Sequence, residues 1–167
     1  VYYLSRKPFS VDKTTIGETL DVSMRALSLI DTGYLALYAV GQLVGGVVAD
    51  RIGARRLLAV GLLAIGASAM LFGLSSTTIG FAASFALLGL VQATGWPGTV
   101  RAMSPWFTGA QRGRVMGLWS TCYQVGGLVA TALAGWVLGR YGWRATFYLP
   151  AALTLGMALL IWQWLPQ

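Results

Sequence analysis

The sequence predicts an all-α membrane protein with six membrane-spanning helices, of which the first is truncated. Hydrophobic residues make up 56% of the 167 residues and charged residues only 10%, and the mean hydropathy is +0.67. Soluble domains carry about 25% charged residues. Apolar runs of membrane-spanning length alternate with short connectors that hold most of the arginines. The 22 glycines suit close packing between membrane helices.

Composition also excludes several function classes. Histidine is absent and Cys122 is the only cysteine, so a disulfide framework or a histidine- or thiolate-based metal site cannot form within this chain. We expect no metal, no cofactor and no enzymatic activity, and we interpret Cys122 as a small packing residue. The net charge of +7 does not indicate nucleic-acid binding, because the arginines lie in connectors and not on one polar face.

The apolar runs place the membrane helices along one unit that covers residues 1–167. We expect these helices at about residues 1–16, 28–49, 57–74, 79–103, 115–138 and 145–165. The first run begins at Val1 without an initiator methionine, and we therefore expect a fragment that lacks the start of its first helix. The lipid bilayer is the expected surrounding of all these helices.

Polar connectors and helix-breaking residues mark the boundaries of the first two predicted helices. Pro8 follows two adjacent cations, at a position where a kink is expected. Residues 12–25 carry charges of both signs and predict a solvated connector between the first two helices. On the second apolar run, Gly41 and Gly45 are four residues apart, which lets another backbone approach closely.

The later boundaries depend on basic turns and on one proline. A short basic turn at residues 50–56 makes the second and third helices an antiparallel hairpin. The sequence Gly-Trp-Pro-Gly at residues 95–98 should kink or unwind the fourth helix. Two further basic connectors, at residues 106–114 and 139–144, precede the fifth and sixth helices.

The turns differ in charge on the two sides of the predicted bundle. One side carries six arginines, whereas the other carries four basic residues together with most of the acidic ones. The six are Arg51, Arg55, Arg56, Arg101, Arg112 and Arg114. By the positive-inside rule, we expect the side with six arginines to be cytoplasmic.

Two adjacent cations, Arg6 and Lys7, lie within the first predicted helix. Each would cost about 2.5 to 3.5 kcal/mol at the membrane centre, so they need a wet cavity or an anion. In a helix, Tyr2 and Tyr3 precede Arg6 by four and three residues and share its face. A guanidinium fork and phenol hydroxyls suit a phosphate or a carboxylate. The alternative is that both cations snorkel to the membrane interface.

Four further residues in the apolar runs are functional candidates. Gln42 and Tyr123 supply neutral hydrogen-bond donors, with polar contacts between helices as the alternative. Trp96 lies in the expected break of the fourth helix, and either walls a cavity or packs beside the adjacent proline. Asp31 either balances one of the two cations, carries a coupling proton, or lies at the membrane interface.

The basic side holds a candidate conformational contact. Asp50 ends the second helix and Arg101 ends the fourth on the same side, so we expect an ion pair that joins the two helices. We interpret this pair, with its neighbours Arg51 and Arg55, as gating residues and not as substrate-binding residues. The alternative is a solvated turn charge, which contributes less than about 1 kcal/mol.

Residues 46–56 follow the pattern G-x-x-x-D-R-x-G-x-R-R, which resembles the signature between helices 2 and 3 of the major facilitator superfamily. Three further stretches are YYLSRKPF from residue 2, QATGWP from residue 92, and WF from residue 106 followed by RG. Together they resemble the organophosphate:inorganic phosphate antiporters, the family of the glycerol-3-phosphate and hexose-phosphate transporters and of the sugar-phosphate exchangers. The similarity runs along essentially the whole chain.

The resemblance implies the amino-terminal six-helix half of a twelve-helix transporter, which exchanges an organic phosphate ester for inorganic phosphate by alternating access. In that family the arginine matching Arg6 contacts the substrate phosphate, with the residues matching Lys7 and Tyr3 beside it. A second arginine would come from the missing carboxy-terminal half. The resemblance also implies a multi-pass protein of the inner or plasma membrane.

Two positions depart from the family pattern. Gln42 stands where glycerol-phosphate and hexose-phosphate members have a lysine, and Tyr123 stands where glycerol-phosphate members have a histidine. The identity of the ester therefore stays open, and the sugar-phosphate exchanger branch fits better. Two other functions also stay open: a membrane sensor of sugar phosphates with the same fold, and a transporter of another organic anion.

Overall fold

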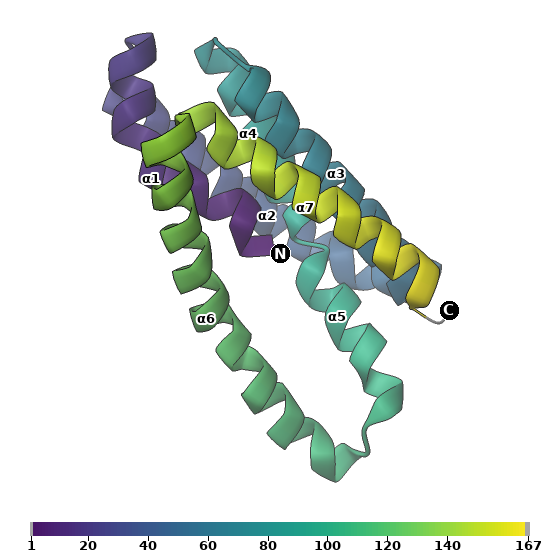
Figure 1. Ribbon diagram of the computed structural model, residues 1–167. Helices are drawn as coiled ribbons and strands as arrows, with labels where there is room; N and C mark the ends of the chain where they lie inside the picture. The colour runs from purple at the N-terminus through teal and green to yellow at the C-terminus, as the bar shows by residue number, and fades with distance from the viewer. Residues whose placement is uncertain (1, 166–167) are drawn as a thin grey trace.

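The computed structural model describes residues 2–165, and within them every regular element is a helix (Figure 1). The helices are α1 (Tyr2–Leu20), α2 (Met24–Ile52), α3 (Ala54–Leu74), α4 (Thr78–Gln92), α5 (Gly95–Met103), the short 3-10 helix η1 (Ser104–Trp106), α6 (Gly109–Tyr141) and α7 (Trp143–Trp164). The ends of the predicted unit, Val1 and residues 166–167, lie outside the described residues. The all-α fold class is confirmed.

Five stretches of the described chain are long and apolar enough to cross a membrane. They are Met24–Ile52, Ala54–Leu74, Thr78–Trp106, Gln111–Tyr141 and Trp143–Trp164. The first helix, α1, is less apolar, because charged side chains interrupt it between residues 6 and 13. Its Phe9 and Ile16 are nonetheless fully buried, so α1 is an integral part of the bundle.

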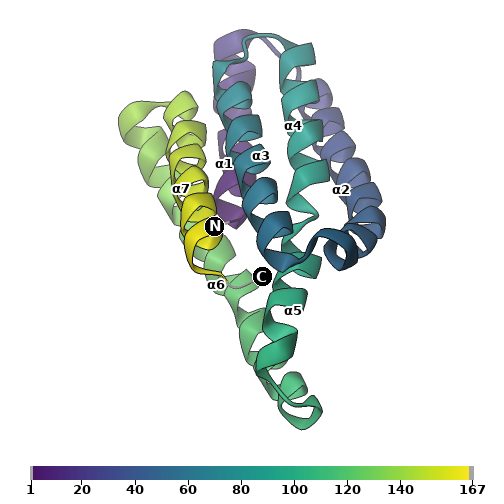
Figure 2. The same ribbon diagram turned by 90° about the vertical axis from the view of Figure 1, so that its right-hand side faces the viewer.

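The helices do not pack evenly around one axis. α3 contacts α7, α4 and α5, while α2 packs against α4 and α1 packs against α6. In both views α5 and the beginning of α6 extend beyond the other helices, and α6 diverges from the rest toward this end (Figures 1 and 2). The first half of α6 is correspondingly exposed. The helices are therefore packed more tightly at one end of the bundle than at the other.

An aromatic core fills the tight end, opposite the basic turns. Phe9, Phe72 and Phe85 are fully buried, with ring centroids 4.4 to 5.5 Å apart. Phe147 of α7 stacks on Phe72 with a centroid distance of 4.3 Å. Offset and edge contacts of this kind stabilise aromatic pairs beyond simple burial. The core joins α1, α3, α4 and α7 at this end.

The polar stretch after the first helix is not the solvated connector that the sequence predicted. α1 continues to Leu20, and Asp12 is fully buried, with its carboxylate accepting a hydrogen bond from the Thr146 hydroxyl of α7. The connector prediction was wrong for Asp12, which is buried, and for residues 17–20, which continue the helix predicted to about residue 16. The reason is that α7 supplies a donor for the Asp12 carboxylate and the core buries Ile16 one turn later, whereas Glu18 is exposed as expected. The connector is short, and Ser23 caps the next helix by accepting from the Ala26 N–H.

Two glycines form the shortest turns. Gly53, between α2 and α3, and Gly142, between α6 and α7, both have a φ of +80°, a conformation that favours glycine. Their N–H groups donate to the carbonyl oxygens of Ala49 and Leu138 at 3.1 Å and so close the preceding helices. Each glycine lets the next helix begin after a single residue.

α2 and α4 approach closely because small residues line their contact. A methyl group at Gly41 would lie 2.6 Å from the Leu90 carbonyl oxygen, and one at Gly45 would lie 3.3 Å from Pro97 Cγ. The predicted stripe of small residues is thus confirmed, with α4 and α5 as its partners.

The break in the fourth membrane span was also predicted, but it comes slightly earlier than expected. α4 ends at Gln92 and α5 begins at Gly95. Pro97 lies in the first turn of α5, where a proline has no helical hydrogen bond to lose. The chain therefore changes helix near the middle of the membrane span and places Trp96 at the start of α5.

Candidate binding cavity

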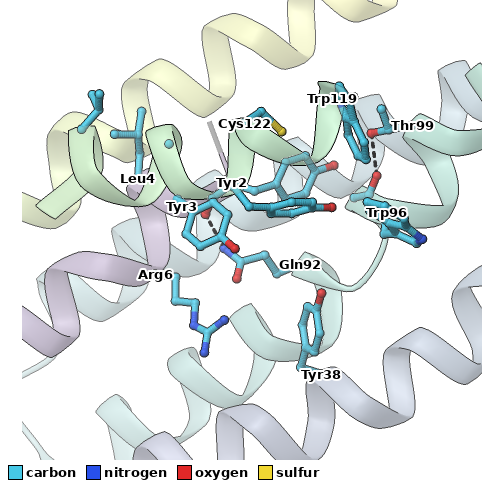
Figure 3. A pocket seen from close by; sticks show the side chains of 14 residues that line it. Tyr2, Tyr3, Leu4, Arg6, Tyr38, Gln92, Trp96, Thr99, Trp119 and Cys122 are labelled. Carbon is cyan, nitrogen blue, oxygen red and sulfur yellow. Dashed lines mark hydrogen bonds between the residues drawn. The ribbon is translucent and has the colours of Figure 1, made fainter. Parts of the chain in front are cut away.

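A cavity of about 280 Å³ opens between α1, α2, α6 and the junction of α4 and α5 (Figure 3). Its wall carries one guanidinium group, together with amide, phenol and indole groups. The lining residues are Tyr2, Tyr3, Leu4, Arg6, Tyr38, Gln92, Gly95, Trp96, Thr99, Trp119, Cys122, Tyr123, Gly126 and Val129. Ligand pockets usually measure about 300 to 1,000 Å³, so this chain alone offers space for a small solute.

Arg6 supplies the positive charge of the cavity. It is partly exposed, and its Cζ lies 5.0 Å from the ring centroid of Tyr34 in α2, which is a cation–π contact. Neither ion pair found within residues 2–165 involves Arg6, so it has no carboxylate partner there. A guanidinium that lacks a carboxylate and faces a cavity is suited to an anionic ligand.

A chain of hydrogen bonds fixes the floor beneath Arg6. The fully buried Tyr34 donates its hydroxyl to Oε1 of Gln92, at the end of α4. Nε2 of Gln92 in turn donates to the Tyr2 carbonyl oxygen at 2.6 Å. The start of α1 is therefore tied to α2 and α4 through one amide, and Tyr2 lies one helical turn before Arg6.

Aromatic rings form the opposite side of the cavity. Trp96 of α5 and Trp119 of α6 have ring centroids 4.8 Å apart, and Tyr123 lies 5.6 Å from each of them. Tyr3 meets Tyr123 edge to face at 5.8 Å. Four of the predicted substrate-binding residues, Arg6, Tyr3, Trp96 and Tyr123, thus line one cavity.

The other two predicted substrate-binding residues do not line this cavity. Gln42 reaches it indirectly, because its Nε2 donates to the hydroxyl of Tyr38, a lining residue, at 2.8 Å. Lys7 lies beside Gly127 of α6. Adjacent residues on a helix point about 100° apart, which explains why Lys7 does not share the direction of Arg6.

Tyr38, Gln92 and Trp119 are among the cavity residues that were not predicted as substrate-binding residues from the sequence. Helical spacing would have found all three. Tyr38 precedes Gln42 by four residues, and Trp119 precedes Tyr123 by four, so each shares a helix face with a predicted residue. Gln92 likewise precedes Trp96 by four residues and opens the QATGWP stretch, although its hydrogen-bond partners Tyr2 and Tyr34 are distant in the sequence.

At the end of the bundle that carries the basic turns, Asp50 and Arg101 form the expected ion pair. Nη1 of Arg101 lies 2.5 Å from Oδ1 of Asp50, and the side chains are 45% and 73% exposed, respectively. Arg55 is separate from this pair, with its guanidinium 4.9 Å from the ring centroid of Trp162 in α7. Arg51 is exposed. The pair therefore joins α2 to α5, whereas Arg55 joins α3 to α7.

Asp31 balances neither Arg6 nor Lys7. Its Oδ2 lies 2.7 Å from Nζ of Lys13, in a partly buried pair that joins α1 to α2. This finding leaves the charge of Arg6 uncompensated within the described residues. No group of three or more His, Cys, Asp or Glu side chains that would hold a metal ion occurs among residues 2–165. The cavity thus offers a cation without a carboxylate partner among the described residues, together with neutral donors and aromatic faces.

Comparison with known proteins agrees with this architecture. The whole chain, residues 1–167, matches the Major Facilitator Superfamily, and the chain therefore belongs to this superfamily of membrane proteins. Together with its membrane-spanning helices, this membership makes it an integral, multi-pass membrane protein.

The chain is also similar to several curated proteins. The chain is 32% identical to a probable hexose phosphate transport protein of Chlamydia pneumoniae, over 96% of this chain and 35% of that protein. It is 30% identical to a membrane sensor protein of Salmonella typhimurium, over 96% of this chain and 36% of that protein. It is 36% identical to sugar phosphate exchanger 3 of Bos taurus, over 81% of this chain and 28% of that protein. The chain spans about a third of the length of these relatives.

Proposed function

We propose that this chain is the amino-terminal half of a transporter that exchanges an organic phosphate ester for inorganic phosphate by alternating access. The observation that carries the proposal is Arg6, a guanidinium that lines a membrane cavity and has no carboxylate partner within the described residues. Relatives named as a hexose phosphate transport protein and a sugar phosphate exchanger support the same class of substrate.

In this proposal Arg6 binds the phosphoryl group shared by both substrates. A guanidinium presents a planar fork of donors to two phosphate oxygens, and such charge-assisted bonds are stronger than neutral ones. Tyr3, Tyr38 and Tyr123 add neutral hydroxyls around the same space, while Gln42 orients Tyr38. Lys7 would act through its charge alone. None of these groups forms a covalent bond to the substrate, so binding and release complete the cycle.

Alternating access then requires a carboxy-terminal six-helix half as a partner. In transporters of this architecture two halves rock about a central site, which opens in turn to each side of the membrane. The divergence of α5 and α6 at the end with the basic turns is consistent with an opening on that side. This side would be the cytoplasmic one, in an inner or plasma membrane. The exposed pair of Asp50 and Arg101 would stabilise one of the two states.

The test is phosphate exchange by the full-length protein in liposomes. Vesicles loaded with inorganic phosphate should take up labelled phosphate or a labelled sugar phosphate, whereas empty vesicles should take up little. A one-for-one exchange supports antiport. Saturable binding without any exchange would instead support a membrane sensor of the same fold, the function named for the Salmonella relative. Exchange that only a phosphate-free organic anion supports would overturn the phosphate assignment.

A further inference from the structure

We propose that Asp12 is a proton-binding site, separate from the cavity, and that its protonated carboxyl group locks α1 to α7 at the end of the bundle that holds the aromatic core. The ligand of this site is a proton alone. The inference does not depend on which solute the protein transports.

Asp12 lies at the contact between the two helices. It is fully buried, and its Oδ2 lies within hydrogen-bond distance of the Thr146 hydroxyl of α7. Its Oδ1 has no hydrogen-bond partner in the described structure. Neither of the two ion pairs of the described chain includes Asp12. An ionised carboxylate here would be a buried charge without a counter-ion, which is strongly unfavourable.

The hydrogen bonds around Thr146 give an independent reason for a proton on Asp12. The Thr146 hydroxyl oxygen lies close to both Oδ2 of Asp12 and the carbonyl oxygen of Trp143. The hydroxyl has one proton, and the carbonyl can only accept. With an ionised Asp12, one of these two close oxygen pairs would have no proton between its atoms. A protonated Asp12 satisfies both pairs, because its O–H donates to the Thr146 oxygen, whose own O–H donates to Trp143.

Charged groups nearby do not replace this proton. The titratable side chains at this end of α1, α2, α6 and α7, and in the connector after α1, are exposed or engaged elsewhere, whereas α3 and α4 carry none at this end. The exposed ones are Glu18, Asp21, Arg25, Arg140 and Tyr141. Lys13 pairs with Asp31 at 2.7 Å. Arg144 and Tyr148 both donate to the Gly73 carbonyl oxygen.

Two prolines allow this contact to open. Pro8 lies four residues before Asp12 on α1, and Pro150 lies four residues after Thr146 on α7. A proline inside a helix removes one backbone hydrogen bond and lets the helix bend there. Thr146 and both prolines border a cavity of about 10 Å³, which is close to the smallest space that holds a water molecule. Bending at the prolines would let water reach an ionised Asp12.

The lock bears on the cavity because α1 carries both groups. Arg6 precedes Asp12 by six residues, which is about 9 Å along the helix axis. A protonated Asp12 therefore fixes the helix that presents Arg6, whereas an ionised Asp12 loosens its contact with α7.

Infrared difference spectroscopy of the purified full-length protein near neutral pH tests the proton directly. The spectrum of the unmodified protein minus that of Asp12→Asn should contain the C=O stretching band of a protonated carboxylic acid, and this band should shift in D2O. Thr146→Val removes the acceptor but keeps the shape of the side chain, so the band should remain at a changed frequency. Glu18→Gln, at an exposed acid on the same helix, is the matched control and should leave the band unchanged.

The pH dependence of thermal unfolding in detergent tests the lock. An aspartate in the unfolded chain ionises above about pH 4, whereas Asp12 keeps its proton while the protein is folded. The folded state then binds one proton more than the unfolded state, so rising pH favours unfolding by about tenfold per pH unit through this group. Asp12→Asn has no proton to lose, so its midpoint should rise relative to that of the unmodified protein between about pH 5 and about pH 7.

Two outcomes would overturn the inference. One is the absence of the acid band from the difference spectrum of folded Asp12→Asn, because Asp12 would then be ionised. The other is a difference in midpoint between Asp12→Asn and the unmodified protein that stays constant with pH. Should Asp12→Asn fail to fold, Thr146→Val carries the test: a shifted acid band supports the site, and an unchanged spectrum overturns it.

Discussion

The guanidinium of Arg6 lies over the ring of Tyr34, with 5.0 Å between Cζ and the ring centroid. The same tyrosine donates its hydroxyl to Gln92, which donates to the carbonyl of Tyr2 on the helix that carries Arg6. Arg6 is thus supported in two ways, by the ring beneath it and by a hydrogen-bonded connection that fixes the start of α1. This support holds the cation toward the cavity without a carboxylate that would compete with an anionic ligand.

Removal of the Tyr34 hydroxyl should weaken phosphate binding while keeping the ring. In Tyr34→Phe the buried Oε1 of Gln92 loses its donor, which costs about 1 to 3 kcal/mol, and α1 is held less firmly. We expect lower stability and an affinity for phosphate reduced by about threefold to tenfold. The control is Tyr148→Phe, which removes a hydrogen bond to the Gly73 carbonyl outside the cavity. Equal loss of phosphate affinity in both variants, measured by equilibrium binding, would contradict this role.

The contact between α2 and α4 predicts a steric effect at Gly41. Alanine there would place a methyl group 2.6 Å from the Leu90 carbonyl oxygen, so the helices must move apart. Overpacking of this kind costs about 1 to 3 kcal/mol. Gly33→Ala on the same helix has no atom within 4 Å and is the matched control. Thermal unfolding in detergent should show a lower midpoint for Gly41→Ala alone, and equal midpoints would contradict the close approach.

The pair of Asp50 and Arg101 should act on turnover and not on binding. Both side chains are substantially exposed, so the pair contributes less than about 1 kcal/mol to stability. We expect Asp50→Asn to change the rate of phosphate exchange and to leave the affinity for phosphate unaltered. Arg114→Gln, a change at another exposed arginine, serves as the control. A changed affinity with normal turnover would exclude a gating role, and rescue by the exchanged pair D50R with R101D would support it.

Because the carboxylate of Asp12 is buried, we expect the protein to keep its stability when Asp12 is replaced by asparagine. Thr146 provides its hydrogen bond, while the other carboxylate oxygen has no partner in the described structure. An uncompensated buried charge is unfavourable, and an amide keeps an acceptor for Thr146 without that charge. Asp12→Asn should therefore unfold at the same temperature as the parent or at a higher one, whereas Asp12→Ala should unfold at a lower one. A large loss of stability in Asp12→Asn, compared with the exposed Glu18→Gln, would contradict this interpretation.

Much of the fold could be predicted from the sequence because membrane helices are set by composition. Apolar runs locate the spans, and the break before Gly95 follows from a local Gly-Trp-Pro-Gly sequence. The contact at Gly41 likewise follows from the spacing of small residues. The burial of Asp12 could not be predicted from its polar surroundings, because it depends on α7, which is distant in the sequence and donates a hydrogen bond from Thr146.

The cavity was predictable where its residues share one helix face or one motif, as Tyr3 and Arg6 do. The structure also identifies cavity residues whose positions depend on contacts between different helices. Gln92 joins α4 to the start of α1 through a hydrogen bond, and Trp119 of α6 packs against Trp96 of α5. The pairing of Asp31 with Lys13 also depends on the crossing of α1 and α2. One sequence without its fold cannot distinguish these partners from other polar residues nearby.

The central claim is that Arg6 binds the phosphoryl group, and equilibrium binding of labelled inorganic phosphate to the purified full-length protein tests it most directly. Arg6→Ala should abolish saturable binding without loss of the folded protein. Arg6→Lys should keep part of the affinity, because a lysine retains the charge but not the planar fork of donors. Near-normal phosphate binding by folded Arg6→Ala would contradict the claim.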